Sequence, residues 1–430
     1  MDSELNFPVL VFFFLSLFPI TFVILIGRDA LTPARLFFYK FFLTSLGALL
    51  LDLTNPVFWV FLLILVLALV IIHVENTFCV KVINVRTRER PGEWNNIRIL
   101  IWLHAGLCLA TQQALIFSFG GLEAYFRLLE LRVVEFAGMG PYLVFINSLG
   151  WINGIFLIII LARNVLPTRR FWLEYSLHTL LSLSVVSLSG SRGATLHILL
   201  NALIIFNVMA RPVSRRLLYG FGVFGILAAL TMGAIRSDLE NIAVSPQALL
   251  AQANILGYST RPLEVFFEAD VEELEYGMTL LTSFTNLVPR AIWPDKPDIA
   301  GVIFTRDYAF DAWEGYSNLA PGIIVEMMMN FGFFCGLLMA LVTISAFWFA
   351  ASALLRRGLQ CKALGKKALL LAAYLMTLNV FSGLTIIDLG YTISSLVPQF
   401  VFIFLLIFLA KIVGLFQRRV GSSSWKNVSL

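Results

Sequence analysis

Long apolar runs separated by short polar connectors make up most of this chain. A helix that crosses a bilayer needs roughly 20 apolar residues, and runs of about this length occur about eleven times. These runs are Phe7–Ile26, Leu36–Leu51, Pro56–Val74, Ile97–Phe119, Tyr142–Leu161, Phe171–Leu188, Ala194–Ala210, Leu217–Ile235, Pro321–Phe349, Ala368–Ile387 and Ser395–Val413. The pattern predicts an all-α polytopic membrane protein with about 11 transmembrane helices, within a range of roughly 10 to 13.

One long stretch, residues 236–320, is neither a spanning run nor a short connector. Its turn and capping residues predict a large, partly helical loop, because Ser245 followed by Pro246 is typical of a helix start. Three short helices are predicted, at Gln247–Leu256, Pro262–Glu272 and Met278–Val288. The chain is thus predicted to comprise N-terminal transmembrane helices (1–235), this loop, and C-terminal transmembrane helices with a tail (321–430).

Composition supports the membrane assignment. Hydrophobic residues make up 59% of the chain and charged residues 13%, and the mean hydropathy is +0.87. These values exclude an ordinary soluble domain. The first run follows Met1-Asp2-Ser3-Glu4, which is acidic where a signal peptide is basic, so we expect a retained helix.

Lysine and arginine crowd alternate connectors. The basic connectors contain Arg28 and Arg35; Lys81, Arg86, Arg88 and Arg90; Arg163, Arg169 and Arg170; Arg211, Arg215 and Arg216; Arg356, Arg357, Lys362, Lys366 and Lys367; and Lys411, Arg418, Arg419 and Lys426. The positive-inside rule places them in the cytoplasm. We therefore expect the N-terminus and residues 236–320 outside and the C-terminus inside. The surplus positive charge then faces anionic lipid, so no nucleic-acid partner is implied.

A glycine-flanked turn, Ser189-Gly190-Ser191-Arg192-Gly193, lies between two predicted spans on the outer side. Its glycines allow a tight turn with exposed N–H groups, and a helix can begin just after it. Arg192 with that helix start forms a plausible phosphate site. The alternative is a simple hairpin turn whose arginine lies at the level of the lipid headgroups.

The large loop is acidic overall but keeps five basic residues: Arg236, Arg261, Arg290, Lys296 and Arg306. Two of them lie in Pro289–Pro297, where three prolines stiffen the backbone. We interpret this stretch as a rigid, positively charged lip that contacts a specific anion. Alternatively, each basic residue pairs with a neighbouring carboxylate.

Few titratable residues fall within the apolar runs. Glu326 lies about one turn inside Pro321–Phe349, a costly place for a carboxylate, which makes it a candidate functional residue. Asp388 can equally be a solvated turn residue. Lys40 is expected to reach the cytoplasmic interface with its long side chain. His73, His104 and His178 are expected to be packing histidines, because no further metal ligands lie near them.

Three motifs together resemble a known family. They are the Gly190–Gly193 turn, the Pro-Arg-x-x-Trp-Pro-x-Lys-Pro pattern of Pro289–Pro297, and the Pro-Gly…Glu…Asn-Phe-Gly pattern of Pro321–Gly332. They resemble the Wzy-type O-antigen polymerases. The resemblance implies a GT-C-like fold in the bacterial inner membrane. It also implies a glycosyltransferase that joins undecaprenyl diphosphate-linked repeat units, with a flippase and a chain-length regulator as possible partners.

The resemblance and the chemistry together suggest roles for individual residues. Arg192 and Arg290 are expected to stabilise the departing diphosphate, because a guanidinium binds two oxygens at once. Glu326 is the candidate base. The substrate-binding candidates are Arg236, Arg261, Lys296, Arg306, Trp293 and Tyr258. No metal or cofactor is expected, since the outer loops contain no Asp-x-Asp or nucleotide-sugar motif.

Two other functions stay open at this point. An O-antigen ligase shares this topology and these arginines but delivers the glycan to lipid A core. A flippase or transporter of lipid-linked oligosaccharides needs charged residues deep in several spans. The apolar runs here are nearly free of such charges, so transport ranks third.

Overall fold

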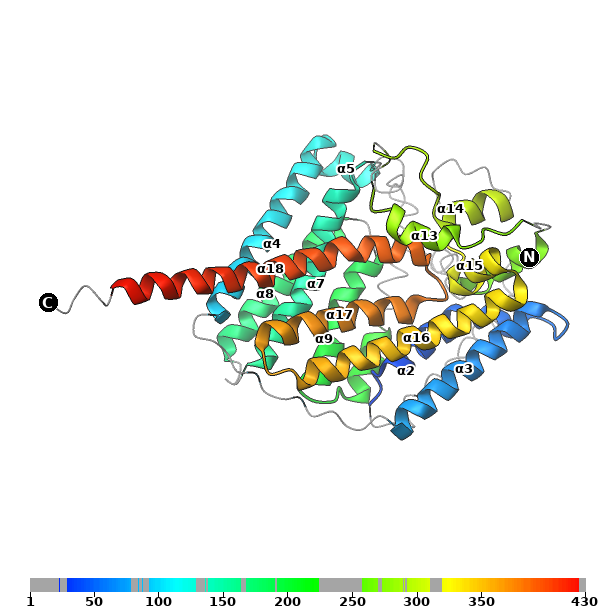
Figure 1. The fold of residues 1–430 in the computed structure, drawn as a ribbon, viewed down its shortest axis with the longest axis horizontal. Helices are drawn as coiled ribbons and strands as arrows, with labels where there is room; N and C mark the ends of the chain where they lie inside the picture. The colour runs from blue at the N-terminus through cyan, green and yellow to red at the C-terminus, as the bar shows by residue number, and fades with distance from the viewer. Residues whose placement is uncertain are drawn as a thin grey trace.

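The computed structural model describes residues 29–78, 93–128, 138–163, 168–189, 192–223, 257–269, 273–288, 292–309 and 319–424, together with residues 23, 84, 87, 136 and 290. Within these ranges the fold is helical and contains no β-strand (Figure 1). Six helices there are long and apolar enough to cross a membrane. They are α3 (Pro56–Phe78), α4 (Glu93–Ser118), α7 (Gly140–Ala162), α16 (Phe333–Gln360), α17 (Leu364–Gly383) and α18 (Leu389–Ser424). The chain is thus an all-α protein with the helices of a membrane-embedded one.

Two further predicted runs are helices, and two others lie largely outside the described residues. The run Phe171–Leu188 corresponds to α8 (Arg169–Ser187), and Ala194–Ala210 corresponds to α9 (Arg192–Met209). The run Leu217–Ile235 is helical up to residue 223, and its remainder lies outside the described residues, as does Phe7–Ile26 apart from Val23.

The run Leu36–Leu51 is not one helix, which corrects the prediction. Helix α2 (Pro33–Thr44) ends at Ser45, and a short 3₁₀ helix, η1 (Leu46–Leu50), follows. The Thr44 hydroxyl bonds back to the carbonyls of Lys40 (2.9 Å) and Phe41 (3.2 Å), a bond that competes with continued helix. The 12 residues of α2 are fewer than the roughly 20 of a typical spanning helix, so this run is a short helix continued by a 3₁₀ helix.

The run Pro321–Phe349 is also interrupted, at Gly332. There α15 (Gly322–Phe331) ends and α16 begins. Gly332 has φ +75°, a left-handed conformation that glycine adopts without a steric penalty. The expected single span is therefore one short helix and one long one.

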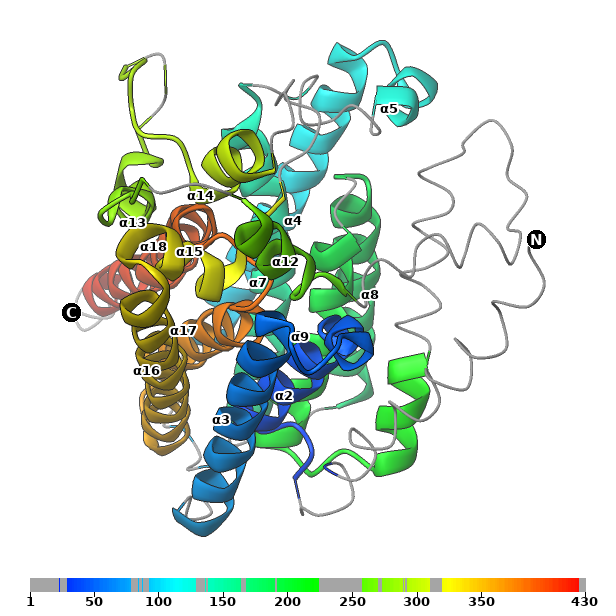
Figure 2. The same cartoon turned by 90° about the vertical axis from the view of Figure 1, so that its right-hand side faces the viewer.

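Helix α7 lies at the centre of the bundle. It packs against α4, α8, α9, α17 and α18, and it is buried almost continuously from Ile146 to Ile160. Helix α17 packs in turn against α2 and α16, and the rings of Phe37 and Phe381 stack there at 4.9 Å. The two views agree on this arrangement (Figure 1 and Figure 2).

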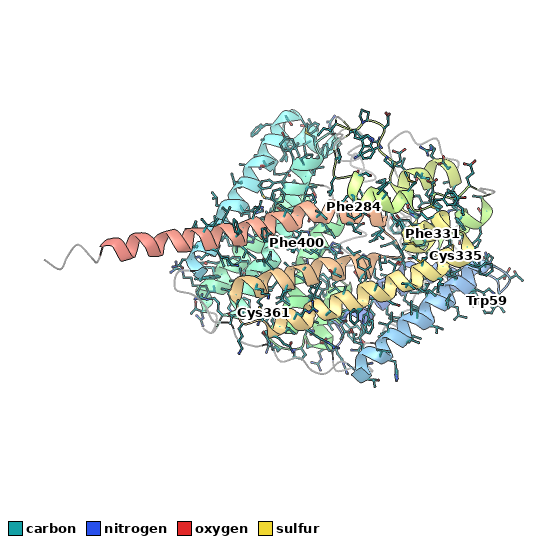
Figure 3. All side chains as sticks on the ribbon, viewed as in Figure 1. Trp59, Phe284, Phe331, Cys335, Cys361 and Phe400 are labelled. Carbon is teal, nitrogen blue, oxygen red and sulfur yellow. The ribbon has the colours of Figure 1, made fainter. Side chains whose placement is uncertain are left out.

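Helices α3 and α16 lie at the edge of the bundle and present apolar side chains outward. Trp59 on α3 is 55% exposed, and Cys335 near the start of α16 is exposed as well (Figure 3). Exposed apolar faces on long helices are what a lipid environment favours.

Part of the predicted large loop folds over one end of the bundle. We call its described residues (257–269, 273–288, 290 and 292–309) the capping segment, and we call the end of the bundle that it covers the capped end. The segment contains α12 (Arg261–Glu268), α13 (Met278–Thr285), α14 (Ala300–Ile303) and the π-helix η3 (Phe304–Tyr308). Backbone N–H of Ser259 donates to Thr44 O at 3.0 Å, and its hydroxyl donates to Thr385 Oγ1 at 3.1 Å. These bonds place the segment over the ends of α2 and α17.

Two of the predicted loop helices are confirmed with shorter ends. The stretch Pro262–Glu272 corresponds to α12, and Met278–Val288 corresponds to α13. The third predicted helix, Gln247–Leu256, lies outside the described residues. Helix α14 and η3 were not predicted, because the four-residue stretch Ala300–Ile303 has no recognisable cap or apolar period of its own.

Candidate functional site

A buried carboxylate, Asp388, joins the capping segment to the start of α18. Asp388 Oδ1 accepts from Tyr391 N–H at 2.9 Å, which caps α18. Its Oδ2 accepts from Gly301 N–H at 2.7 Å, near the start of α14. Burial raises the pKa of Asp388 above its ordinary value. The residue is thus a structural tie between two helix starts, not a solvated turn residue.

Glu326 makes a second tie of the same kind. It is fully buried on α15; Oε1 accepts from Thr279 Oγ1 at 3.2 Å, and Oε2 accepts from Leu389 N–H at 2.9 Å. One turn later, Asn330 donates to Thr279 Oγ1 at 2.6 Å and accepts from Gly277 N–H at 2.7 Å. The conspicuous residues of the Pro321–Gly332 motif therefore hold α13 against α15 and α18.

The proline-rich turn is closed by an ion-pair network on Asp298. Arg290 Nη2 pairs with Asp298 Oδ1, and Arg290 Nη1 donates to Pro294 O at 2.9 Å. Arg306 Nη1 lies 3.3 Å from Asp298 Oδ2, and two further bonds join Arg306 to Asp307. Both guanidinium groups are about half exposed, at 53% and 50%. Each arginine therefore has a carboxylate partner and an open face.

Lys296 is turned inward, in contrast to these arginines. It is only 8% exposed, and Nζ donates to Val288 O at 2.8 Å and to Asn286 Oδ1 at 3.1 Å. Burial, followed by the nearby charge of Arg290, lowers the pKa of Lys296. Asn286 Nδ2 donates to Ser394 Oγ of α18 at 2.9 Å. Lys296 thus fixes the turn to Asn286, which in turn contacts the bundle, and little of its side chain faces solvent.

The other predicted site residues are spread over the capping segment and beyond it. Tyr258 and Trp293 are exposed, at 51% and 42%. Arg261 lies 3.5 Å from Glu264 and lines a cavity of about 620 Å³ with Tyr308. Arg192 is the first residue of α9, but its side chain lies outside the described part of the chain, as does all of Arg236.

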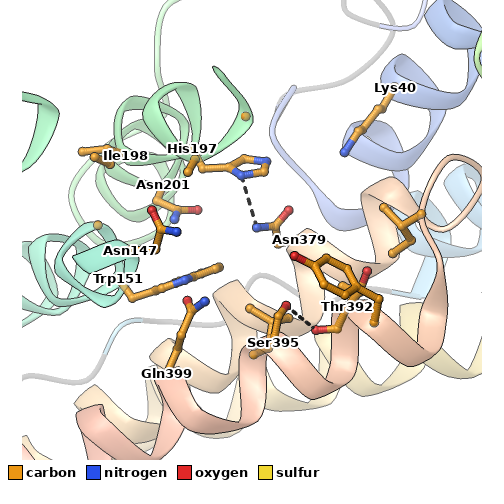
Figure 4. A pocket seen from close by; sticks show the side chains of 16 residues that line it. Lys40, Asn147, Trp151, His197, Ile198, Asn201, Asn379, Thr392, Ser395 and Gln399 are labelled. Carbon is orange, nitrogen blue, oxygen red and sulfur yellow. Dashed lines mark hydrogen bonds between the residues drawn. The ribbon is translucent and has the colours of Figure 1, made fainter. Parts of the chain in front are cut away.

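A second cavity, of about 360 Å³, lies inside the helical bundle (Figure 4). Its walls come from α7, α9, α17 and α18, with one side chain from α2. Most of the side chains lining it are polar. They include the carboxamides of Asn147, Asn201, Asn379 and Gln399, the hydroxyls of Tyr391, Thr392 and Ser395, the indole of Trp151, and Lys40 and His197.

Lys40 and His197 give this cavity its titratable character. His197 Nδ1 lies 3.4 Å from Asn379 Nδ2. Lys40 Nζ rests against the backbone at Gly383, where an added Cβ would lie only 2.9 Å away. The prediction that Lys40 reaches the cytoplasmic interface is wrong, because α2 packs against α17 and directs this side chain into the bundle.

His197 was not singled out from the sequence, although one signal was available. It lies shortly after the predicted turn, on the helix that Arg192 begins. The packing role predicted for His104 and His178 matches their environment. His104 bonds Ser148 at 3.0 Å and His178 bonds Asn153 at 2.8 Å. His73, by contrast, is exposed on α3.

Two of the sequence motifs adjoin the bundle cavity. Gly193, which follows Arg192, lines it. Ser394, which the Lys296–Asn286 contact reaches, directly precedes the lining residue Ser395. Glu326 belongs to the hydrogen-bond network that joins α13, α15 and α18, and it does not line the cavity. The start of α9 thus lines the polar cavity, whereas the proline-rich turn contacts α18 through Ser394, which is not a lining residue.

Comparison with known proteins adds no relative. No family model matches this chain, and searches among curated proteins and solved structures find no match either. The residues and contacts described above are therefore what support a function.

Proposed function

We propose that this protein is a glycosyltransferase of the bacterial inner membrane that polymerises undecaprenyl diphosphate-linked oligosaccharide repeat units into O-antigen or a related polysaccharide. The observation that carries this proposal is the polar cavity near the capped end of the helical bundle. A lipid-linked sugar needs both surroundings at once: apolar helices beside its tail and hydrogen-bonding groups around its head.

The cavity lining suits a saccharide. Carboxamides donate and accept hydrogen bonds, as sugar hydroxyls do. Asn147, Asn201, Asn379 and Gln399 supply four of them. The indole of Trp151 adds a flat apolar face, which packs well against the C–H face of a sugar ring. Such a mixture of aromatic and placed polar groups is typical of a small-molecule site.

In the proposed reaction, a sugar hydroxyl oxygen of one repeat unit attacks the anomeric carbon of the growing chain. The bond from that carbon to the diphosphate oxygen breaks, and the electron pair leaves with undecaprenyl diphosphate. Fixed cations can stabilise this charge without a metal. Arg192 and Arg290 are the proposed catalytic cations, and Arg236, Arg261, Lys296 and Arg306 support binding. Lys296 can do so only through the turn that it holds, since its ammonium is engaged inside the protein.

The hydroxyl proton needs an acceptor. Glu326 is the carboxylate that the sequence suggests, but each of its oxygens already accepts a hydrogen bond from the protein. Its role as a base therefore stays a prediction, with a test given below.

The proposed function implies a particular membrane topology. About 11 helices, in a GT-C-like arrangement, cross the membrane, with the N-terminus and the capped end in the periplasm and the C-terminus in the cytoplasm. A flippase then supplies the outward-facing repeat units, and a chain-length regulator is a possible partner.

Reconstitution tests the proposal. Given only undecaprenyl diphosphate-linked repeat units, the purified protein should make a ladder of longer lipid-linked glycans and release undecaprenyl diphosphate. A deletion strain should still cap its lipid A core with one repeat unit. Free lipid-linked polymer with an uncapped core identifies a ligase instead. Movement of the lipid-linked unit across the membrane without new glycosidic bonds identifies a transporter.

A further inference from the structure

Lys40 is a cation without a partner in the described part of the bundle. No hydrogen bond or ion pair joins its Nζ to another described residue, and none of the residues lining its cavity is a carboxylate. An ammonium inside an apolar bundle is costly unless an anion or several oxygens compensate it. The arrangement is therefore incomplete without a ligand.

Two other lysines in this protein have their charge compensated by protein oxygens. Lys296 donates to three oxygens of the capping segment. Lys367, at the opposite end of α17, is fully buried, and its Nζ donates to Asn84 Oδ1 at 2.7 Å. Lys40 is less buried than these two lysines, and it lines the cavity with no oxygen of the described residues bonded to its Nζ (Figure 4).

The rest of the cavity indicates what kind of anion fits. Lys40 lies on one side, Trp151 and Gln399 lie on the other, and His197 and Asn379 lie between them (Figure 4). A simple inorganic anion would leave these amides and the indole unused. A saccharide that carries a negative charge uses all of them, with its ring near Trp151 and its anionic oxygens on Lys40.

We propose that this cavity binds an anionic saccharide and that Lys40 Nζ contacts its carboxylate or phosphate oxygens. The inference rests on the proposed function for the ligand being a saccharide. The charge has two possible sources, an acidic sugar within the repeat unit or the diphosphate that joins the unit to its lipid. At about 360 Å³, the cavity is near the lower end of small-molecule sites, roughly 300–1,000 Å³, so it fits a short part of the repeat unit.

Binding to the full-length protein in lipid nanodiscs tests this proposal. Three probes are compared: a disaccharide of galacturonic acid, the matching neutral disaccharide of galactose, and undecaprenyl diphosphate. For wild type we expect at least one anionic probe to bind. Lys40→Met should weaken its binding at least tenfold, Lys40→Arg should weaken it less, and the weak binding of the neutral sugar should not change.

The pattern across probes identifies the source of the charge. Dependence of the acidic disaccharide on Lys40 assigns an acidic repeat unit, and dependence of undecaprenyl diphosphate on Lys40 assigns the lipid carrier. Lys367→Met is the matched control, because it removes a buried lysine far from the cavity, and it should leave every Kd unchanged.

Several outcomes overturn the inference. They are no binding of either anionic probe by wild type, unchanged binding after Lys40→Met, or an equal loss for the neutral sugar. Folding is checked without ligand, where Lys40→Met should keep or raise Tm, since it removes an uncompensated buried charge. Polymer synthesis is measured separately. Lys40-dependent binding without polymer overturns only the proposed function, and polymer without such binding overturns only this inference.

Discussion

Lys296 and Ser394 bind the same carboxamide, that of Asn286. Lys296 Nζ lies 3.1 Å from Asn286 Oδ1, and Asn286 Nδ2 donates to Ser394 Oγ at 2.9 Å. The proline-rich turn is thereby attached to the stretch of α18 that lines the bundle cavity. A close approach supports this contact, since a Cβ at Gly390 would lie within 2.9 Å of Thr279 O on α13. The turn is thus held against the same helix whose other side chains line the cavity.

Removing the Lys296 ammonium should loosen the turn. Lys296→Met leaves Val288 O and Asn286 Oδ1 without their charged donor, which should destabilise the capping segment by roughly 2–4 kcal/mol. Hydrogen exchange over residues 286–298 and limited proteolysis measure the effect. Lys362→Met, an exposed lysine in a connector, is the control. Equal protection in the two variants would show that the hydrogen bonds of Lys296 are dispensable.

Variants of Arg290 and Asp298 can distinguish a catalytic role of Arg290 from a structural one. If Arg290 stabilises the departing diphosphate, Arg290→Ala should lower the polymerisation rate by ~10²-fold or more, with partial rescue by Lys. Asp298→Asn removes the ion pair but leaves the guanidinium in place, so it should keep most of the rate. Equal losses in the two variants, measured per folded molecule, would assign Arg290 a structural role.

For Glu326, stability and rate should respond differently. Gln keeps the shape of the side chain but cannot accept at both positions, so one of the donors, Thr279 Oγ1 or Leu389 N–H, loses its acceptor. We expect Glu326→Gln to lower Tm and to leave the rate per folded molecule largely unchanged. The exposed Glu273→Gln variant is the control. A rate loss of ~10²–10⁴-fold at unchanged Tm would instead identify Glu326 as the general base.

The attachment of the capping segment should depend on pH through Asp388. Its folded-state pKa is raised by burial, so the folded form binds its proton more tightly than the unfolded form does. The contribution of protonated Asp388 to the stability of the folded form is therefore fully present below the ordinary aspartate pKa, ~3.9. It is lost as the pH rises through the raised pKa of Asp388 in the folded form. Proteolysis of the segment should therefore quicken as the pH is raised. Asp388→Asn should reduce that dependence, and an identical pH profile in this variant would argue against it.

Single cysteines test the proposed topology in a chain whose own cysteines are replaced. Tyr276 (80% exposed) and Asp295 lie on the capping segment, whereas Ser214 lies on a basic connector. An impermeant thiol reagent added to intact cells that have a permeabilised outer membrane should label cysteines at Tyr276 and Asp295 and spare one at Ser214. The reverse pattern would place the capping segment in the cytoplasm and remove the basis for a periplasmic reaction.

The helical, membrane-embedded character of the protein could be predicted from its amino-acid sequence. Long apolar runs can be satisfied only as helices in a membrane, and most of the described residues in those runs are helical. Helices near Pro262 and Met278 within residues 236–320 were also predicted, and α12 and α13 correspond to them. Interruptions of helices within the apolar runs could not be predicted from the apolar pattern. The turn after Thr44 and the bend at Gly332 depend on backbone choices that an apolar pattern does not encode.

The roles of the polar residues depend on contacts between segments that are distant in the chain. From the sequence, Glu326 was a candidate functional residue and Asp388 a possible turn residue. In the structure, each accepts hydrogen bonds from segments distant in the chain. Lys40 and His197 lie on different helices, and only the packing of α2, α9 and α17 brings them into one cavity. Periodicity and composition are local properties, whereas burial and partners are set by contacts between distant helices. For that reason the sequence predicted a membrane-embedded helical protein with a folded loop, and the packing decided which of its polar groups are structural and which line the cavity.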